Sequence, residues 1–526
     1  MPKKLPTGLT SFSEIIRNNC VYVDKTKFIS TLSQQKYYFL SRPRRFGKSV
    51  FLDTLKHAFL GSKELFKGTY LENNWDWSKT HPVVKISFSG NNFSVEGALD
   101  VRINEILKHC ANEYNINLED TSHGGKLGEL ITKLYAQTKD KDQIGNVVVL
   151  IDEYDKPILD AIDNPELAIE NRNILKGFYG ILKDLDTSLK FVFVTGVTKF
   201  AKAGIFSDLN NLNDITLNEE YADICGYTQN DIDTIFKDHL IDVDLAELRR
   251  WYNGYNFLGK ETQKVYNPFD ILLFINNGKK YQNYWFGTGT PSFLIKLLQN
   301  REYYLPQIEN LVVGEELLNS FDIEHLSIET LLLQSGYLTI TNTIANPFGG
   351  GEVNYQLNYP NYEVRKSLTT SLINYFIADK AKLSYANTNL ANALLKRDFV
   401  RLEEYLRSFF SGIPYNWHNG NNNMAEYEGY YCTVIYSLLN SLGIVASAED
   451  ATSQGRIDLS LDVLEYRIIL EFKLKKNGDA ASAIKQIKDK NYAGKYTADG
   501  KPIYLVGISF DTETRNLHDF KHELVK

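Results

Sequence analysis

Cysteine is scarce in this sequence of 526 residues, which contains only four. The four lie far apart and form no Cys-x-x-Cys pair, so we expect neither a zinc site nor a disulfide framework. Long apolar runs are also missing, since no stretch reaches the roughly 18 residues that a membrane span needs. The segment Met1–Pro6 has no apolar core typical of a signal peptide. We therefore expect a soluble cytoplasmic protein without a membrane partner.

An excess of positive charge is absent as well. Lysine and arginine number 58 against 65 aspartates and glutamates, which leaves a net charge of −7. This balance excludes a polybasic coat that binds nucleic acid in bulk, but it does not exclude a local basic groove. With 43% hydrophobic and 23% charged residues the chain is neither disordered nor collagen-like. Its length allows about three domains.

The first third of the chain alternates strand-like and helix-like patterns. Apolar runs predict strands over Tyr37–Ser41, Val83–Phe88, Asn146–Ile151 and Leu189–Val194, and a helical apolar stripe follows the first of them over Lys48–Leu60. Helical stretches separate the strands, which is typical of βαβ units. We therefore expect a parallel sheet with both faces covered by helices.

The middle of the chain is mainly helical by pattern. Helices broken by aromatic turns are expected from Ala201 to Asn300, and mostly helical structure from Glu309 to Leu402. Within the latter region, Tyr337–Thr341 is strand-like and Gly349–Gly351 is typical of a hairpin turn.

The last part of the chain predicts a compact α/β unit. It follows a polar segment, His418–Asn423, whose composition is typical of a loop. The elements expected after this loop are a helix over Ala425–Leu442, strands near Ile457–Leu461 and Tyr466–Phe472, a helix over Ala480–Lys490 and a closing strand over Ile503–Ile508.

The segment Arg42–Ser49 lies between the first predicted strand and the helix behind it. Gly47, Lys48 and Ser49 fit the core of a P-loop, in which backbone N–H groups cradle phosphates, the lysine reaches the β- and γ-phosphates and the hydroxyl holds Mg²⁺. Arg42 stands where that motif has its first glycine. The motif alone fits a basic turn without nucleotide equally well.

A second motif favours nucleotide binding. The next-but-one strand ends in Asp152 and Glu153, the Walker B arrangement, where the first acid holds Mg²⁺ through water and the second polarises the attacking water. Solvated acids at the end of a buried strand are the alternative. Thr195, ahead of Thr198, is expected beside the γ-phosphate as a sensor, although threonines at strand ends often cap turns.

A carboxylate and lysine cluster lies near the C-terminus. Glu471 and Lys473 share one face of a predicted strand, and a hairpin would bring Asp458 within reach of the same ion. Mg²⁺ suits such oxygen ligands, and an ion there activates water and stabilises charge on a scissile phosphate. Lys473 would position that water, and Glu428 would be a further ligand or an orienting acid. An exposed edge with one ion pair is the alternative for Glu471-x-Lys473 alone.

Local charge agrees with a site that contacts phosphates. Basic residues outnumber acidic ones between Glu465 and Lys495, within a chain whose net charge is −7. A solvated helix face would show the same excess, so this support is modest.

These motifs together resemble a family of bacterial proteins with an N-terminal AAA-ATPase-like domain and a C-terminal PD-(D/E)XK nuclease-superfamily domain. The resemblance covers most of the chain. In the N-terminal part it is carried by Tyr22–Thr26, Arg42–Ser49, Ile151–Asp155, Val194–Val197, Trp251–Tyr255 and Tyr266–Phe269. In the C-terminal part it is carried by Ile413–Tyr415, Glu428, Gly455–Asp458, Glu471–Lys473, Gln486–Ile487 and Tyr492.

The resemblance implies an α/β protein with a P-loop NTPase parallel sheet, a helical lid, a mostly helical connector and a C-terminal restriction-endonuclease-like domain. The corresponding boundaries are 1–205, 206–300, 301–405 and 406–526. The implied nucleotide-binding residues are Arg44, Arg45, Phe46, Gly47, Lys48, Ser49, Asp152 and Thr195, with Ser49 and Asp152 on Mg²⁺ and Glu153 catalytic. For Arg44 and Arg45, a solvated or phosphate-steering pair fits better than a transition-state finger.

For the nuclease domain, the resemblance implies Asp458, Glu471 and Glu428 as metal ligands, Lys473 as the catalytic lysine and Gln486 as an auxiliary group near the scissile phosphate. The spacing from Gln486 to Tyr492 is wider than the Q-x-x-x-Y of RecB-like nucleases, which leaves a structural role open for Tyr492.

We therefore predict an ATP-binding protein with a Mg²⁺-dependent nuclease domain under nucleotide control. Its nucleic-acid partner would be DNA rather than RNA, and self-association into a homo-oligomer is left open. The alternative is a nucleotide-dependent switch or scaffold whose nuclease-like domain binds nucleic acid or protein without cleaving. An ATPase motor would need a trans-acting arginine, and no single arginine can be assigned that role.

Overall fold

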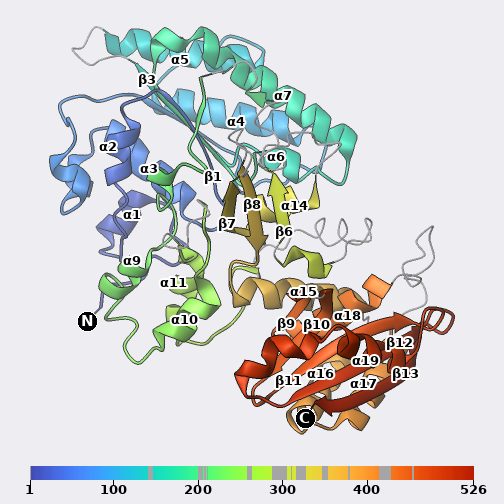
Figure 1. The fold of residues 1–526 in the computed structure, drawn as a ribbon. Helices are drawn as coiled ribbons and strands as arrows, with labels where there is room; N and C mark the ends of the chain where they lie inside the picture. Colours follow the sequence, from blue (N-terminus) through green and yellow to red (C-terminus); the bar gives the residue numbers. More distant parts are fainter. Residues whose placement is uncertain are drawn as a thin grey trace. The chain divides into compact units, whose positions relative to one another are not determined.

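The structure is a computed structural model that describes residues 2–139, 146–199, 205–206, 209, 211–257, 264–286, 305–309, 311–314, 327–345, 353–376, 380–413, 428–452 and 455–525. The chain divides into two compact units. The first consists of Met1–Thr288 and Val312–Asn361, and the second of Gly289–Leu311 and Tyr362–Lys526. Figure 1 shows their elements. The four domain boundaries expected from the sequence remain predictions.

A five-stranded sheet forms the centre of the first unit, in the order β2-β3-β4-β1-β5. All neighbouring strands are parallel, as predicted. The strands are β1 (Tyr37–Ser41), β2 (Val83–Ser87), β3 (Val147–Asp152), β4 (Leu189–Gly196) and β5 (Asn213–Asp214). Every residue of β1 and β3 is buried, because helices cover both faces of the sheet.

Helices pack on both faces of this sheet. In Figure 1, α4, α5 and α7 lie together on one side, while α1 and α3 lie on the other. The right-handed crossover rule explains this division, because β1 connects to β2 in the direction opposite to the connections from β2 to β4. The helices are α1 (Phe12–Arg17), α2 (Lys27–Leu32), α3 (Lys48–Phe59), α4 (Ala98–Glu113), α5 (His123–Lys139), α6 (Lys156–Leu159) and α7 (Pro165–Asp184).

Short capped helices follow β5, as the aromatic turns predicted. They are α9 (Gln229–Thr234), α10 (Leu245–Tyr252), α11 (Pro268–Asn276) and α14 (Ile328–Ser335). Thr228 forms a capping box with Asp231, and the side chains of Asp244 and Asn267 accept hydrogen bonds from the first turns of α10 and α11. These caps explain where each helix begins.

The strand-like segment at Tyr337–Thr341 belongs to a three-stranded sheet in the order β6-β8-β7. Its strands are β6 (Leu311–Gly314), β7 (Thr339–Ala345) and β8 (Val353–Asn358), and β7 and β8 are antiparallel. The predicted turn at Gly349–Gly351 lies outside the described residues. The strand-like break and the hairpin expected within this mostly helical region therefore correspond to the antiparallel strands β7 and β8.

The second unit contains a five-stranded mixed sheet in the order β13-β12-β11-β10-β9, with β11 and β12 parallel and the other neighbours antiparallel. Helix α19 makes the crossover between the parallel pair. The elements are α15 (Tyr362–Phe376), α16 (Lys380–Leu395), α17 (Phe399–Ser411), α18 (Glu428–Ser441), β9 (Ala446–Thr452), β10 (Gly455–Val463), β11 (Tyr466–Leu474), α19 (Ala480–Asp489), η10 (Tyr492–Asp499), β12 (Ile503–Asp511) and β13 (Asn516–Val525).

The expectation that Ile503–Ile508 closes this unit was wrong, because β13 follows β12 along the chain. Both strands that the sequence pattern missed, β9 and β13, lie at the edges of the sheet. Edge strands are half solvated, so β13 is interrupted by polar and charged residues and β9 contains alanines and acids. The predicted loop at His418–Asn423 and the start of the helix predicted from Ala425 lie outside the described ranges.

Candidate functional sites in the two units

The first unit contains a pocket with a volume of about 610 Å³, within the size range of small-molecule sites. It is lined by the loop between β1 and α3 and by Asp152 and Glu153 at the end of β3. Apolar side chains also line it, namely Pro6, Leu9, Val21, Val23, Phe269 and Leu272. The pocket therefore offers charged groups for phosphates and apolar groups for a flat ring.

The loop before α3 adopts a conformation that few sequences allow. Gly47 has φ +91° and leads directly into the helix, and Arg45 has φ +69° although it carries a side chain. A Cβ at Gly47 would meet no atom within 4 Å, so the backbone conformation rather than crowding favours glycine there. The turn aims the N-terminus of α3, including Ser49, at the pocket.

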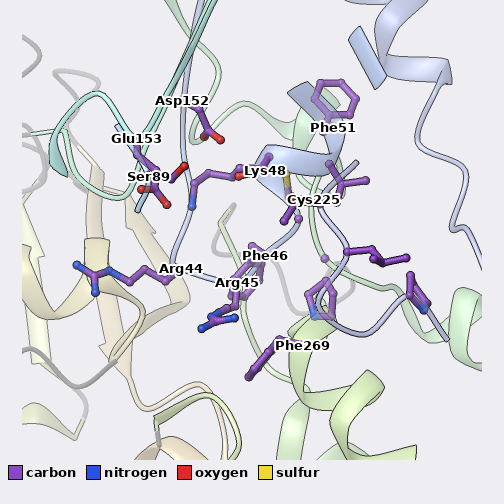
Figure 2. Close-up of a pocket in the computed structure, with 18 of the residues that line it drawn as sticks. Arg44, Arg45, Phe46, Lys48, Phe51, Ser89, Asp152, Glu153, Cys225 and Phe269 are labelled. Atoms are coloured by element: carbon purple, nitrogen blue, oxygen red, sulfur yellow. The ribbon is translucent and has the colours of Figure 1, made fainter. Parts of the chain in front are cut away.

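Lys48 is buried and donates hydrogen bonds to the carbonyl oxygens of Arg42 and Pro43, each at 2.8 Å. Burial lowers the pKa of its ammonium, although Asp152 and Glu153 oppose this shift. Figure 2 shows the side chain directed toward these two acids. Lys48 thus lies between its own loop and the acids that follow β3.

Arg42, at the position of the first P-loop glycine, packs behind the loop rather than lining the pocket. Its guanidinium is buried and donates to the carbonyl oxygens of Thr216 at 2.7 Å and Tyr221 at 3.0 Å. It also lies 4.0 Å from the ring centroid of Phe257, and burial lowers the pKa of Arg42 to about 10. The arginine therefore ties the loop to its surroundings and leaves the phosphate side of the loop open.

The other residues predicted to bind nucleotide differ in their roles. Phe46 is buried, with its ring 4.7 Å from that of Tyr255, so it anchors the loop. Arg44 and Arg45 both line the pocket, and the Arg45 guanidinium lies 4.3 Å from the ring centroid of Phe269 (Figure 2). Two arginine side chains in a pocket beside the phosphate loop fit the steering role expected from the sequence.

Asp152 and Thr195 meet because of the strand order. Strand β4 lies between β1 and β3, so its C-terminal end separates the phosphate loop from the acids after β3. There the Thr195 hydroxyl donates to Oδ1 of Asp152 at 2.8 Å. The structure therefore brings the predicted sensor threonine into direct contact with the predicted Mg²⁺ acid.

Glu153, the proposed base, also lines the pocket. Burial and then the negative charge of Asp152 raise the pKa of Glu153, while Lys48 lowers it. Its backbone φ is +55°, an uncommon value for a residue other than glycine or asparagine. A partly desolvated carboxylate near Lys48, on a residue with a strained backbone, is suited to accept a proton from water.

Sequence reasoning assigned no role to Asp155, which organises the turn after β4. It is fully buried and accepts hydrogen bonds from the Val197 N–H at 3.1 Å and from the Thr198 N–H and hydroxyl, each at 2.6 Å. Burial raises the pKa of Asp155 despite these bonds. Thr198 is thus bound to Asp155. The presence of a third acid two residues after the Walker B pair is the sequence signal that could have indicated a role for Asp155.

The second candidate site lies on the mixed sheet of the second unit. Asp458 comes from β10, Glu471 and Lys473 from the adjacent β11, Glu428 from the start of α18 and Gln486 from α19. Oδ2 of Asp458 accepts a hydrogen bond from the Phe472 N–H at 2.8 Å, which holds the two strands together beside the site.

Glu471 is the most constrained member of this cluster. Its side chain is only 1% exposed. Oε1 accepts hydrogen bonds from Lys473 at 3.2 Å and from the Gln486 amide. The buried Oε2 has no hydrogen-bond partner among the described residues. Burial and then the charge of Asp458 raise the pKa of Glu471 to about 8, although Lys473 opposes the shift. An unsatisfied carboxylate oxygen beside a second acid is suited to a cation.

Lys473 lies between two acids. Its ammonium is 3.2 Å from Oε1 of Glu471 and 3.8 Å from Oε1 of Glu428, and it donates to the Phe472 carbonyl at 2.7 Å. Burial lowers the pKa of Lys473, but the two glutamates outweigh burial and raise it above its ordinary value. Glu428, whose own pKa is raised by burial, is therefore placed to orient the lysine.

Tyr492 reaches the site despite its wide spacing from Gln486. The helix α19 ends before Asn491, whose φ of +45° turns the chain back, and Tyr492 then begins η10. Burial and then the negative charge of Glu471 raise the pKa of Tyr492, so the tyrosine lies near the cluster, and its hydroxyl would lie 2.9 Å from a Cβ on Gly455. The longer spacing therefore delivers the tyrosine from a following turn instead of from the helix itself.

The residues present fit one Mg²⁺ held mainly by Asp458 and Glu471. In the part of the chain that the structure describes, no group of three or more histidine, cysteine, aspartate or glutamate side chains is arranged to hold a metal ion. Two carboxylates suffice when the substrate phosphate and water complete the ion's coordination. Since Glu428 lies against Lys473, its assignment as a third ligand has weaker support than its assignment as an orienting acid.

The basic excess around this site is largely paired within the chain. Asp or Glu side chains bind the lysines at 475, 485, 488 and 495 and the arginine at 467. The excess of basic residues in this segment is therefore not by itself evidence for a surface that binds nucleic acid.

A parallel α/β sheet with a phosphate-loop pocket, joined in one chain to a mixed sheet with an Asp–Glu–Lys cluster, defines an ATPase-like protein with a nuclease-like domain. Residues 6–206 match the family described as "Predicted AAA-ATPase", and residues 426–520 match the PD-(D/E)XK nuclease superfamily. The chain belongs to the family of AAA-ATPase-like proteins with a C-terminal PD-(D/E)XK domain, as the sequence predicted.

The chain is similar over almost its whole length to a protein of Azotobacter chroococcum mcd 1 described as "Uncharacterized protein in vnfD 5'region". The two are 41% identical over 520 residues, which cover 98% of each chain. No solved structure matches this chain. Among the helices within the described ranges, none combines the length and the apolar character needed to cross a membrane.

Proposed function

We propose that this protein is a Mg²⁺-dependent nuclease that cleaves phosphodiester bonds, in DNA rather than RNA, under the control of ATP bound in its first unit. The observation that carries the proposal is the convergence of Asp458, Glu471, Lys473 and Gln486, which come from the neighbouring strands β10 and β11 and from α19. Oε2 of Glu471, which is buried and has no hydrogen-bond partner in the part of the chain that the structure describes, supports an ion there. A bound Mg²⁺ would supply activation of water and stabilisation of charge on the scissile phosphate.

The protein's own residues would divide the remaining work. Gln486 holds Oε1 of Glu471, which would leave Oε2 to bind the ion. Lys473, fixed by Glu428 and the Phe472 carbonyl, presents a cation to the nucleophile and to the phosphate. Because hydrogen bonds to charged groups are short and directional, this arrangement orients the attacking water.

In the first unit, Lys48 would exchange its bonds to the loop carbonyls for the β- and γ-phosphates of ATP. Ser49 and Asp152 would hold the accompanying Mg²⁺, and Thr195 would fix Asp152. Glu153 would take the proton from the water that attacks the γ-phosphate, which its raised pKa supports. The apolar side chains that line the pocket would contact the base.

The test is a cleavage panel with Mg²⁺ or Mn²⁺ on linear double-stranded, circular and single-stranded DNA and on RNA, with and without ATP. We expect metal-dependent cleavage of DNA at a rate that changes with ATP. Cleavage that persists unchanged in the Asp458→Ala and Glu471→Ala variants would contradict the assigned site. Binding of ATP and nucleic acid without any cleavage would instead support a nucleotide-dependent scaffold.

A further inference from the structure

A short segment between α10 and α11 packs directly on the phosphate loop. The ring of Tyr255 lies 4.7 Å from that of Phe46 with an interplanar angle of 81°, and Phe257 lies 6.0 Å from the same ring. Phe257 also stacks on the guanidinium of Arg42, 4.0 Å away. Both ends of the loop that precedes Lys48 are therefore held by one segment, residues 254–257, which we call the support segment.

The opposite side of the support segment is bound to β7. The Asn256 N–H donates to the Thr339 hydroxyl at 2.7 Å, and that hydroxyl donates to the Asn256 carbonyl at 3.0 Å. Both residues are buried. A single hydroxyl thus satisfies the backbone donor and the backbone acceptor of Asn256, which fixes the support segment to the first residue of β7.

The support segment also approaches the end of the β7–β8 pair closely. Gly254 has φ +129°, and a Cβ there would lie 1.8 Å from the carbonyl oxygen of Pro360. Only glycine fits such an approach without movement of the backbone. Pro360 belongs to the connection between β8 and α15, so the support segment touches β7 at its beginning and the chain just after β8.

A second set of contacts links the loop to the same region. The Trp285 indole donates to the Arg44 carbonyl at 3.1 Å, and its ring lies 5.2 Å from that of Tyr337. A Cβ on Gly336 would lie 2.6 Å from Pro43, so the turn between α14 and β7 packs against the loop. All of these contacts lie within the first unit.

We propose that the support segment and Thr339 position the phosphate loop, so that nucleotide binding is coupled to the β7–β8 pair. This inference rests on the proposed binding of ATP at Lys48. Lys48 is bonded to the Arg42 and Pro43 carbonyls, and phosphate binding would draw it away from them. Arg42 and Pro43 are in turn the loop residues that contact Phe257 and Gly336.

The coupling has a direct physical reason. Tightly packed contacts of this kind do not deform continuously, so a change in the loop is passed to the atoms packed on it. By linkage, if nucleotide binding stabilises the contact between the support segment and β7, then loss of that contact weakens nucleotide binding by the same factor. Thr339 therefore acts as a positioning residue, since it lies outside the pocket and acts on the loop through Asn256.

The test compares three substitutions on the full chain, with ATP·Mg²⁺ affinity measured by calorimetry. Thr339→Val removes both hydrogen bonds to Asn256 while keeping the shape of the side chain. Thr339→Ser keeps the hydroxyl, and Thr341→Val is a matched control, because the Thr341 hydroxyl donates to the Gln356 carbonyl within the β7–β8 pair. We expect Thr339→Val to weaken ATP affinity about tenfold, and the other two variants to bind as the native chain does.

Hydrogen exchange of the native chain gives a readout that does not depend on any variant folding. We expect ATP·Mg²⁺ to slow exchange of the β7 amides. Unchanged exchange in β7 on ATP binding, or equal losses of affinity in Thr339→Val and Thr341→Val, would overturn the inference alone. If the native chain binds no ATP, the inference and the nucleotide half of the proposed function both fail, whereas the nuclease half is judged by the cleavage panel.

Discussion

In the pocket of the first unit, Lys48 donates to two carbonyls of its own loop, whereas in the second unit Lys473 lies between Glu471 and Glu428. Basic side chains outnumber acids around the first lysine, because Arg44, Arg45 and further lysines line the same pocket. Around the second lysine the acids are in excess. The first site therefore suits an anion and the second a cation.

The difference shows that a site proposed to bind nucleotide and a site proposed to cut a phosphodiester bond need side chains of opposite charge. A site that binds nucleotide needs cations and N–H groups to receive the phosphates. A site that cuts a phosphodiester needs carboxylates, which recruit a metal ion that then faces the phosphate. A substitution in one of the two sites should change the activity of that site, while the activity of the other site serves as the reference.

Among substitutions that leave both proposed metal ligands in place, the largest effect is expected from Lys473→Ala. Removal of the cation that faces the scissile phosphate should lower the cleavage rate by about 10²–10³-fold, as for other groups that stabilise charge in a transition state. ATP affinity should be unchanged. The matched control is Lys475→Ala, because Lys475 is paired with Asp511 at 2.8 Å. Equal losses in the two variants would show that lysine at this position is structural.

Lys48→Ala should act on the other site. We expect ATP affinity to fall by about 10–100-fold, because hydrogen bonds to charged groups contribute roughly 1.5–3 kcal/mol. Cleavage in the absence of ATP should remain at the native rate. Lys56→Ala, on the same helix and 3.6 Å from Glu113, is the control in the calorimetric titration. A native ATP affinity in Lys48→Ala would contradict the pocket assignment.

The affinity of the second site for Mg²⁺ should depend on pH. The pKa of Glu471 is raised to about 8, so below that pH its carboxyl carries a proton that the ion must displace. We expect apparent Mg²⁺ affinity to fall about tenfold for each pH unit below 8 and to level off above it. Calorimetric titration with Mg²⁺ between pH 6 and 9 checks this. An affinity independent of pH over that range would exclude Glu471 as the titrating ligand.

The smallest effect is expected from Tyr492→Phe. Loss of the hydroxyl removes at most one neutral hydrogen bond beside the cluster, worth about 1 kcal/mol, which corresponds to about fivefold in rate. The control is Tyr496→Phe, whose hydroxyl lies 3.1 Å from the Ser460 hydroxyl. Cleavage by Tyr492→Phe at the native rate would show that the tyrosine only packs against Gly455.

The sequence predicted the parallel sheet well, because its strands are buried on both faces and appear as continuous apolar runs such as Val147–Ile151. Edge strands such as β13 escaped prediction, since half of their residues face water and interrupt the pattern. The antiparallel pair β7 and β8 was anticipated as a strand-like break at Tyr337–Thr341 and a hairpin around Gly349–Gly351. Local apolar patterns therefore predicted the centre of each sheet better than its edges.

The residues of the candidate sites were also predicted unevenly, since local motifs were found more readily than partners from distant segments. The phosphate loop is one contiguous segment, so its lysine and serine could be proposed from local order. The partners of the loop, among them Asp155, Tyr255 and Thr339, come from distant segments that only the fold brings together. Tyr492 shows the limit of spacing rules, because a turn after α19 compensates for the longer interval.

The most direct measurement of the proposed nuclease is cleavage of end-labelled linear double-stranded DNA by the native chain and by Asp458→Asn, at equal Mg²⁺ concentration. The substitution keeps the shape of the side chain and its contact with the Phe472 N–H, but it removes the charge that an ion needs. We predict cleavage by the native chain that EDTA abolishes, and none by Asp458→Asn. Equal cleavage by both chains would contradict a metal-dependent site at Asp458 and Glu471.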